Sequence, residues 1–140
     1  MYRYIKAMAD TRKAVERELK SCGRQIVVHL TKLMIYPEAQ QANHWKQEIY
    51  SFLNNVPKLK GSKKYPSKSF IFNAISVYVD TIDSIKWQLQ YDESDLTQLD
   101  IDDAVIEKKA TRYLDWLATE LSQKGAVQSV QVYNMLDKII

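Results

Sequence analysis

The sequence predicts an all-α fold, a helical bundle of four to five helices that forms one domain over residues 1–140. Apolar residues recur at steps of three and four along most of the chain, which is the period of an amphipathic helix. Only three glycines and three prolines interrupt this pattern, and no alternation of strands and helices is apparent. The composition, 46% hydrophobic and 26% charged, is that of a folded chain.

The first two helices are predicted on either side of Pro37. A helical stripe runs from Tyr2 to about Ile35 and keeps its phase across Gly23, so we expect one long helix. A glycine inside a helix costs about 1 kcal/mol relative to alanine, so Gly23 marks a weak point, and two helices with a tight break are the alternative. Pro37 suits the first turn of a second helix that extends to about Asn55.

Three more segments complete the bundle. We predict a third helix from Ser67, as N-cap, to Tyr91, and expect it to be the most buried one, with Trp87 and Trp116 in the core. An acidic link precedes a fourth helix over about residues 102–123, and Gly125 ends that helix. Residues 126–140 are predicted as a helix, with a short valine-rich strand over residues 127–133 as the alternative.

Several functional classes are excluded by residues that the chain lacks. Three glycines so far apart cannot build the phosphate-binding loops of Rossmann or P-loop enzymes. The soft or imidazole ligands are Cys22, His29 and His44, without the spacing of a zinc site, so we expect no metal and no cofactor. The single cysteine, the missing signal-peptide pattern and the absence of a long apolar run predict a cytoplasmic protein that makes no membrane contact.

Charge is divided unevenly along the chain. Residues 1–68 hold 14 Lys or Arg and 5 Asp or Glu, a net charge of +9, whereas residues 69–140 hold 6 and 12, a net charge of −6. This division indicates a surface with two poles, although the two halves neutralising each other in the folded monomer is the alternative. Opposed poles also permit the chain to form a homo-oligomer.

Basic residues gather at two places in the first half. The loop predicted over residues 56–67 carries Lys58, Lys60, Lys63, Lys64 and Tyr65, and Lys68 follows it. On the first helix Arg17, Lys20 and Arg24 are spaced by three and four, so they share a face. Lysines and arginines neutralise phosphates and a tyrosine stacks on a base, so these residues are candidates for binding nucleic acid or an acidic protein surface.

One short motif suggests catalysis. Arg24 and His29 have the spacing R-x4-H, which resembles the R-x4–6-H motif of HEPN helical domains, many of which are metal-independent ribonucleases. The resemblance implies His29 as a general base and Arg24 as a group that stabilises the phosphorane. HEPN motifs usually lie on a late helix, whereas this one lies on the first.

A second resemblance covers about residues 14–50. Ser21, His29-Leu30, Lys32, Pro37, Trp45 and Ile49 together are similar to a bacterial family of helical proteins, the domain of unknown function 29 family. This resemblance implies an all-α fold and brings no activity with it.

The sequence therefore predicts a non-enzymatic helical binding module whose basic first half contacts nucleic acid or an acidic protein partner. The ribonuclease and a structural, self-associating protein are the two alternatives.

Overall fold

A computed structural model describes residues 2–37, 40–52, 66–92 and 98–140, with side chains from Arg12 onward. Within these ranges the order is α1 (Tyr2–Ile35), α2 (Ala42–Phe52), α3 (Lys68–Ile75), the 3-10 helix η2 (Val77–Thr81), α4 (Ile82–Asp92), α5 (Asp103–Lys124) and α6 (Ser129–Ile139). The predicted all-α bundle is confirmed, and no strand occurs in the part of the chain that is described. Residues 129–139 are helical, as predicted.

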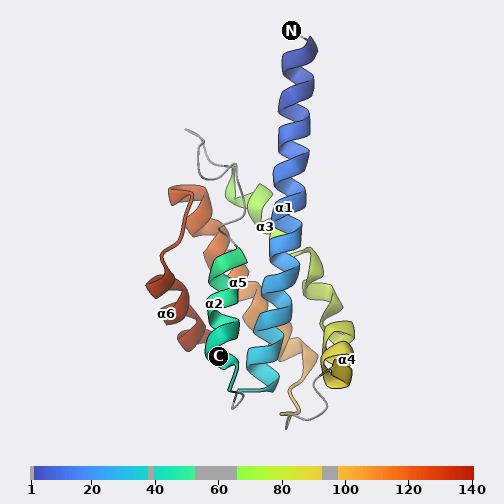
Figure 1. Ribbon diagram of the computed structural model, residues 1–140, viewed down its shortest axis with the longest axis vertical. Coiled ribbons are helices and arrows are strands. Elements are labelled where there is room, and N and C mark those ends of the chain that lie inside the picture. The colour runs from blue at the N-terminus through green and yellow to red at the C-terminus, as the bar shows by residue number, and fades with distance from the viewer. Residues whose placement is uncertain (1, 38–39, 53–65, 93–97) are drawn as a thin grey trace.

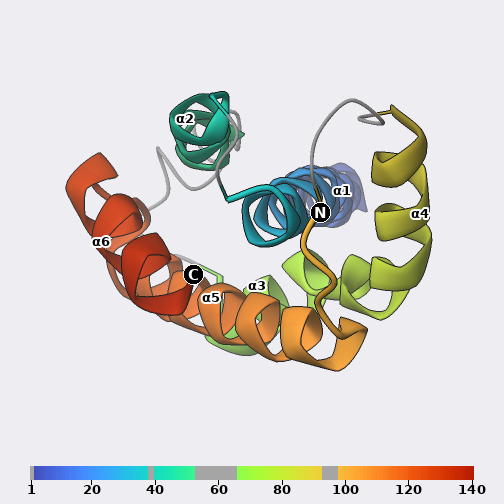
Figure 2. The same ribbon diagram turned by 90° about the horizontal axis from the view of Figure 1, so that it is seen from below.

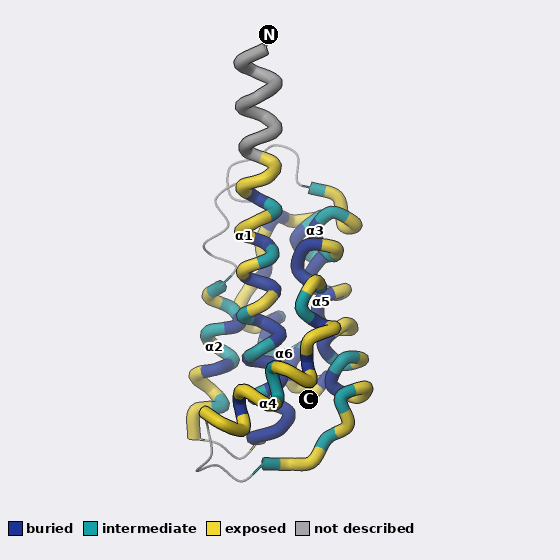
Figure 3. The backbone as a smooth tube through the Cα atoms, turned by 90° about the vertical axis from the view of Figure 1, so that its right-hand side faces the viewer, coloured by how far each residue is buried: buried dark blue, intermediate teal, exposed yellow. Residues whose placement is uncertain are grey.

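Helix α1 is the centre of the bundle. It is one continuous helix, and its N-terminal part projects beyond the other helices (Figure 1). Seen from below, α2, α6, α5, α3 and α4 form an arc around α1, which leaves the side of α1 between α2 and α4 without a helix over it (Figure 2). Buried and exposed residues alternate along α1 because only one side of it faces the core (Figure 3).

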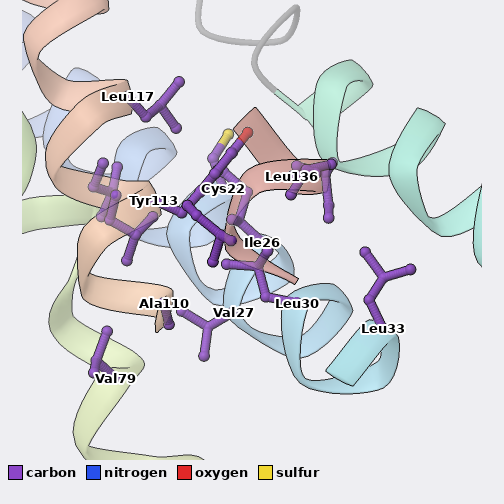
Figure 4. Packing of buried hydrophobic residues seen from close by; sticks show 14 of the residues in the cluster. Cys22, Ile26, Val27, Leu30, Leu33, Val79, Ala110, Tyr113, Leu117 and Leu136 are labelled. Atoms are coloured by element: carbon purple, nitrogen blue, oxygen red, sulfur yellow. The ribbon is translucent and has the colours of Figure 1, made fainter. Parts of the chain in front are cut away.

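The core joins all the helices of the described part. Its fully buried side chains include Leu19, Ile26 and Leu30 of α1, which face Leu114 and Leu117 of α5 in one apolar cluster. Figure 4 shows side chains of α1, α5 and α6 meeting in this cluster. Burial of such side chains stabilises the fold by about 1.5–3 kcal/mol each relative to exposure.

Gly23 lies where α1 meets α3. A Cβ atom built on Gly23 would lie 2.2 Å from the backbone oxygen of Ile75 and 2.5 Å from its Cα. The glycine therefore allows the backbones of α1 and α3 to touch, and the helix continues through it. The sequence predicted a weak point there, whereas the structure shows a close helix crossing.

The predicted helix ends agree with the structure at three places. Ser67 caps α3 by accepting a hydrogen bond from the amide of Phe70 at 3.2 Å. Asp102 caps α5 by accepting from Ala104 at 2.9 Å. Gly125 ends α5 with φ 71°, in the left-handed region that favours glycine.

The predicted helix over residues 67–91 is divided in the structure. The chain leaves α3 at Ser76, with φ −95° and ψ 1°, and passes through one 3-10 segment before α4 begins. Trp87 is 66% exposed, because it lies on the face of α4 opposite the buried Ile82 and Leu89, and its expected burial was wrong. Trp116 is partly buried and packs against the core.

Candidate binding surface

Four cations follow one exposed face of α1. Lys13, Arg17, Lys20 and Arg24 recur at steps of four, three and four, so they form one row along the helix, called the α1 cation stripe below. Lys13, Arg17 and Arg24 are exposed and Lys20 is half-buried. The structure thus places the predicted residues Arg17, Lys20 and Arg24 on one accessible face.

The stripe is only lightly engaged by other groups. Lys20 pairs with Glu16, one turn earlier, at 3.1 Å, and both side chains are partly exposed. Arg24 lies with its guanidinium carbon 6.0 Å from the ring centroid of Tyr78. Within the described ranges Arg17 has no ion-pair partner. Exposed ion pairs such as Lys20 with Glu16 contribute about 0–1 kcal/mol to stability. An anion that binds Lys20 more tightly than Glu16 does can therefore displace the Glu16 carboxylate.

Only the end of the predicted lysine-rich loop, residues 66–67, lies within the described part of the chain. Lys58, Lys60, Lys63, Lys64 and Tyr65 lie outside the described residues. Lys68 opens α3 and forms an ion pair with Asp115 of α5 at 3.1 Å. Two residues later, Phe70 lies under the guanidinium of Arg12, 5.0 Å from the ring centroid, which places the start of α3 beside α1.

The acidic half neutralises only part of the basic half. Among the described residues, two ion pairs join a cation of residues 1–68 to a carboxylate of the later half, Lys46 with Asp137 at 3.3 Å and Lys68 with Asp115. Neither of these pairs involves the α1 cation stripe. The stripe therefore keeps its positive charge at the surface.

Arg24 and His29 lie on different sides of α1. Arg24 is exposed, whereas His29 is only 6% exposed and packs at the contact with α2. The Nδ1 atom of His29 lies 2.7 Å from the carbonyl oxygen of Gln25, and its Nε2 contacts a carboxylate oxygen of Glu48. Both ring nitrogens are thus engaged, and this arrangement does not offer the free imidazole that a general base needs.

Glu48 is a polar link that the sequence did not indicate. Its second carboxylate oxygen lies 2.6 Å from Nε2 of the exposed His44, so one carboxylate bridges a buried and an exposed histidine. Both partners of His29 are oxygen atoms, so a ring nitrogen donates to its partner only when that nitrogen carries a proton. Both contacts are hydrogen bonds when both ring nitrogens carry a proton, or when Glu48 carries the proton between itself and Nε2. No sequence motif joins these residues, because they lie 19 positions apart on two helices.

Cys22 is buried on the same side of α1. Its thiol donates to the backbone oxygen of Phe52 at 2.9 Å. Burial, with a smaller effect of the Glu18 charge, raises the pKa of Cys22 to about 11. A thiol held in its neutral form is a poor nucleophile and a poor metal ligand, so Cys22 acts as a small residue of the core. Across the described residues no group of three or more His, Cys, Asp or Glu has an arrangement that could hold a metal ion.

A second surface feature lies on α4. Trp87 and Tyr91 are 66% and 74% exposed, and their rings stack with centroids 6.2 Å apart and planes 12° from parallel. The spacing of four between them was visible in the sequence, but Trp87 was expected in the core and no role was predicted for Tyr91 beyond the end of the helix. None of the described helices has both the length and the apolar character of a membrane-spanning segment.

Comparison of the chain with protein-family models, with curated proteins and with solved structures finds no match. The resemblances over residues 14–50 and at Arg24 and His29 thus stay predictions. The candidate site rests on geometry alone.

Proposed function

We propose that this protein is a non-enzymatic binding module whose α1 cation stripe engages an anionic partner, either nucleic acid or an acidic protein surface. The observation that carries the proposal is the row of Lys13, Arg17, Lys20 and Arg24 along one accessible face of α1. The row lies on a continuous helix that is anchored in the core, so its charges keep a fixed spacing. Fixed cations along a rod suit a polyanion with regularly spaced charges.

The lysines of residues 58–64 extend this proposal. The chain returns to the bundle at Pro66, and α3 begins beside α1 at the contact of Phe70 with Arg12. The lysines lie outside the described residues, and on their sequence alone they add positive charge to the proposed binding module. Tyr65 would add a ring that stacks on an unpaired base.

Fluorescence anisotropy with a labelled single-stranded RNA and a DNA duplex tests the proposal, with poly-glutamate as the probe for an acidic protein surface. We expect affinity for the nucleic acid to fall steeply with salt, because binding releases counterions. Each phosphate contact contributes about 0.9 to the slope of log K against log salt for duplex DNA and about 0.7 for single strands.

Arg17→Glu combined with Arg24→Glu should weaken binding at least about tenfold and flatten the salt slope. Lys58, Lys60, Lys63 and Lys64→Ala tests the loop in the same way. The matched control is Lys108→Glu with Arg112→Glu, which makes the same change of charge at two exposed positions of α5. Equal effects of the stripe and the control variants, or no binding of any of the three probes at low salt, would overturn the proposal.

A further inference from the structure

The outer face of α4 carries a row of one carboxylate and two aromatic rings. Asp83, Trp87 and Tyr91 follow each other at steps of four, so they line up along the helix, and they are called the α4 row below. All three residues are exposed. Large aromatic side chains with this much exposure are characteristic of contact surfaces, where tryptophan and tyrosine contribute much of the binding energy.

The opposite face of α4 is fixed to the bundle. Ile82 and Leu89 are buried in the core. Lys86 points inward as well, because its ammonium group donates to the carbonyl oxygen of Ile101 and to Asp103, each at 2.8 Å. The α4 row thus lies on a rigid helix and faces away from the core.

The charge near the row is negative. Within residues 77–92, which are all described, the ionisable groups other than tyrosines are Asp80, Asp83, Asp92 and Lys86. The three carboxylates are exposed, and the one cation is held by Asp103. A surface of aromatic faces and carboxylates suits a partner that presents arginine or lysine, since both groups attract these cations.

The α1 cation stripe has the chemistry that this surface requires. Cations of this chain already lie over aromatic rings in three places, Arg12 over Phe70, Arg24 over Tyr78 and Lys32 over Trp45. The lengths also agree, because seven residues from Arg17 to Arg24 and eight from Asp83 to Tyr91 span about 10 and 12 Å of helix. The stripe and the row cannot meet within one chain, because the row faces away from the core that holds α1.

We propose that the α4 row binds the α1 cation stripe of a second copy of this chain. The exposed stripe reaches η2, the segment just before α4, because Arg24 lies over Tyr78. The projecting part of α1 lies at one end of the molecule and α4 toward the other (Figure 1). Two copies side by side and antiparallel place the stripe of each against the row of the other. The contact is then made twice about a two-fold axis, and the assembly closes as a dimer.

This inference rests on the proposed function, because it uses the same cations and identifies one acidic protein surface that they recognise. It also predicts competition, since a nucleic acid bound to the stripe displaces the second copy. The dimer should therefore dissociate when nucleic acid is added and when the salt concentration is raised.

Sedimentation velocity of the full chain at low salt, over a range of concentrations, tests the inference. We expect a monomer–dimer equilibrium whose dissociation constant rises at least about tenfold in the variant Trp87→Ser with Tyr91→Ser. Val130→Ser is the matched control, because Val130 is also an exposed apolar residue but lies on α6. It should leave the equilibrium unchanged.

The binding measurements separate the two proposals. Trp87→Ser with Tyr91→Ser should keep full affinity for the RNA probe, whereas Arg17→Glu with Arg24→Glu should lose both RNA binding and the dimer. A wild-type chain that stays monomeric, or a dimer that ignores the α4 substitutions, overturns this inference even if RNA binding persists. Loss of the dimer in both variants without RNA, DNA or poly-glutamate binding overturns the proposed function and supports the α4 contact.

Discussion

Helix α1 contacts two of its neighbours, α3 and α2, by different physical means. Toward α3 the contact is one of shape, because Gly23 lets the backbone of Ile75 approach to a distance that no side chain allows. Toward α2 the contact is polar, since His29 meets Glu48 and the thiol of Cys22 donates to the backbone of Phe52. Phe52 also packs edge-on against the His29 ring, with centroids 5.0 Å apart.

This difference predicts how each contact responds to change. Where two backbones pack closely, as at Gly23, even one added carbon atom forces them apart and causes a large loss of stability. A polar contact weakens by degrees, and it depends on which of its groups carry protons. The α3 side should thus be sensitive to side-chain volume, and the α2 side should be sensitive to pH.

Gly23→Ala should give the largest effect. The added Cβ would overlap the backbone of Ile75, so α3 must move, and we expect the free energy of unfolding to fall by about 3 kcal/mol. Helix propensity alone predicts a gain of about 1 kcal/mol, so the sign of the change decides between the two effects. Urea unfolding followed by circular dichroism measures it.

The control for this substitution is Ser21→Ala, at an exposed position of the same helix. It should stabilise the protein by a few tenths of a kcal/mol, from propensity alone. If Gly23→Ala is as stable as the wild type, the close crossing of α1 and α3 does not exist.

Alkaline pH should weaken the α2 side. The Cys22 thiol has an ordinary pKa of 9.0, which burial raises to about 11 in the fold. Between these values the unfolded chain loses a proton that the folded chain keeps, so stability is full below pH 9 and falls as pH rises toward 11. Two pKa units correspond to a loss of about 2–3 kcal/mol.

Unfolding measured at pH 8 and at pH 11 (about one unit below the ordinary pKa and at the raised one) tests this prediction. Cys22→Ser keeps a donor for the backbone oxygen of Phe52 but does not titrate in this range. The difference in stability between wild type and Cys22→Ser should therefore shrink as pH rises. A constant difference would mean that the thiol is not shielded in the fold.

The sequence predicted those parts of the fold that local chemistry decides. Ser67, Asp102 and Gly125 act at helix ends through their own side chain or backbone, so neighbouring residues suffice to identify them. The spacing of Arg17, Lys20 and Arg24 was enough to place them on one face, because helix geometry alone determines it.

Contacts between distant segments could not be predicted in this way. The role of Gly23 depends on Ile75, which lies far along the chain. Helix propensity alone therefore predicts only the destabilising effect of a glycine inside a helix. The break at Ser76 is hidden because the apolar pattern keeps its period across it. Trp87 was expected in the core, but Trp87 and Tyr91 lie on the face of α4 opposite the buried Ile82 and Leu89 and are exposed. Glu48 was missed because its partner His29 lies on another helix.

Glu48→Ala should have a moderate effect on the α2 side. It removes the partner of the buried His29 ring nitrogen, and a buried polar group left without a partner costs about 1–3 kcal/mol. His44→Ala removes the other contact of the same carboxylate, but His44 is exposed, so we expect a loss within about 0.5 kcal/mol. Thermal unfolding at neutral pH compares the two.

A double-mutant cycle shows whether the link is direct. Glu48→Ala and His29→Ala together should cost less than the sum of the single changes, because the first substitution has already broken the contact that the second one removes. Strictly additive losses would show that His29 and Glu48 do not interact in solution.

Tyr113→Phe should give the smallest effect, and it tests whether the Tyr113 hydroxyl contributes to the hydrophobic core. The Tyr113 hydroxyl is fully buried in the core cluster beside α1 (Figure 4), and no hydrogen-bond partner for it occurs among the described residues. Burial without a partner raises its pKa above the ordinary value. Removing such a hydroxyl is neutral or stabilises the fold by up to about 1 kcal/mol.

Tyr36→Phe is the matched comparison for that substitution. Tyr36 is also buried, but its hydroxyl donates to the backbone oxygen of Leu89 at 3.4 Å, so its removal should destabilise the protein by about 0.5–1 kcal/mol. Opposite signs for the two tyrosines would show that the Tyr36 hydroxyl stabilises the fold through its hydrogen bond, whereas the Tyr113 hydroxyl does not. A loss of stability for Tyr113→Phe as large as that for Tyr36→Phe would mean that the Tyr113 hydroxyl has a partner in solution, such as a buried water.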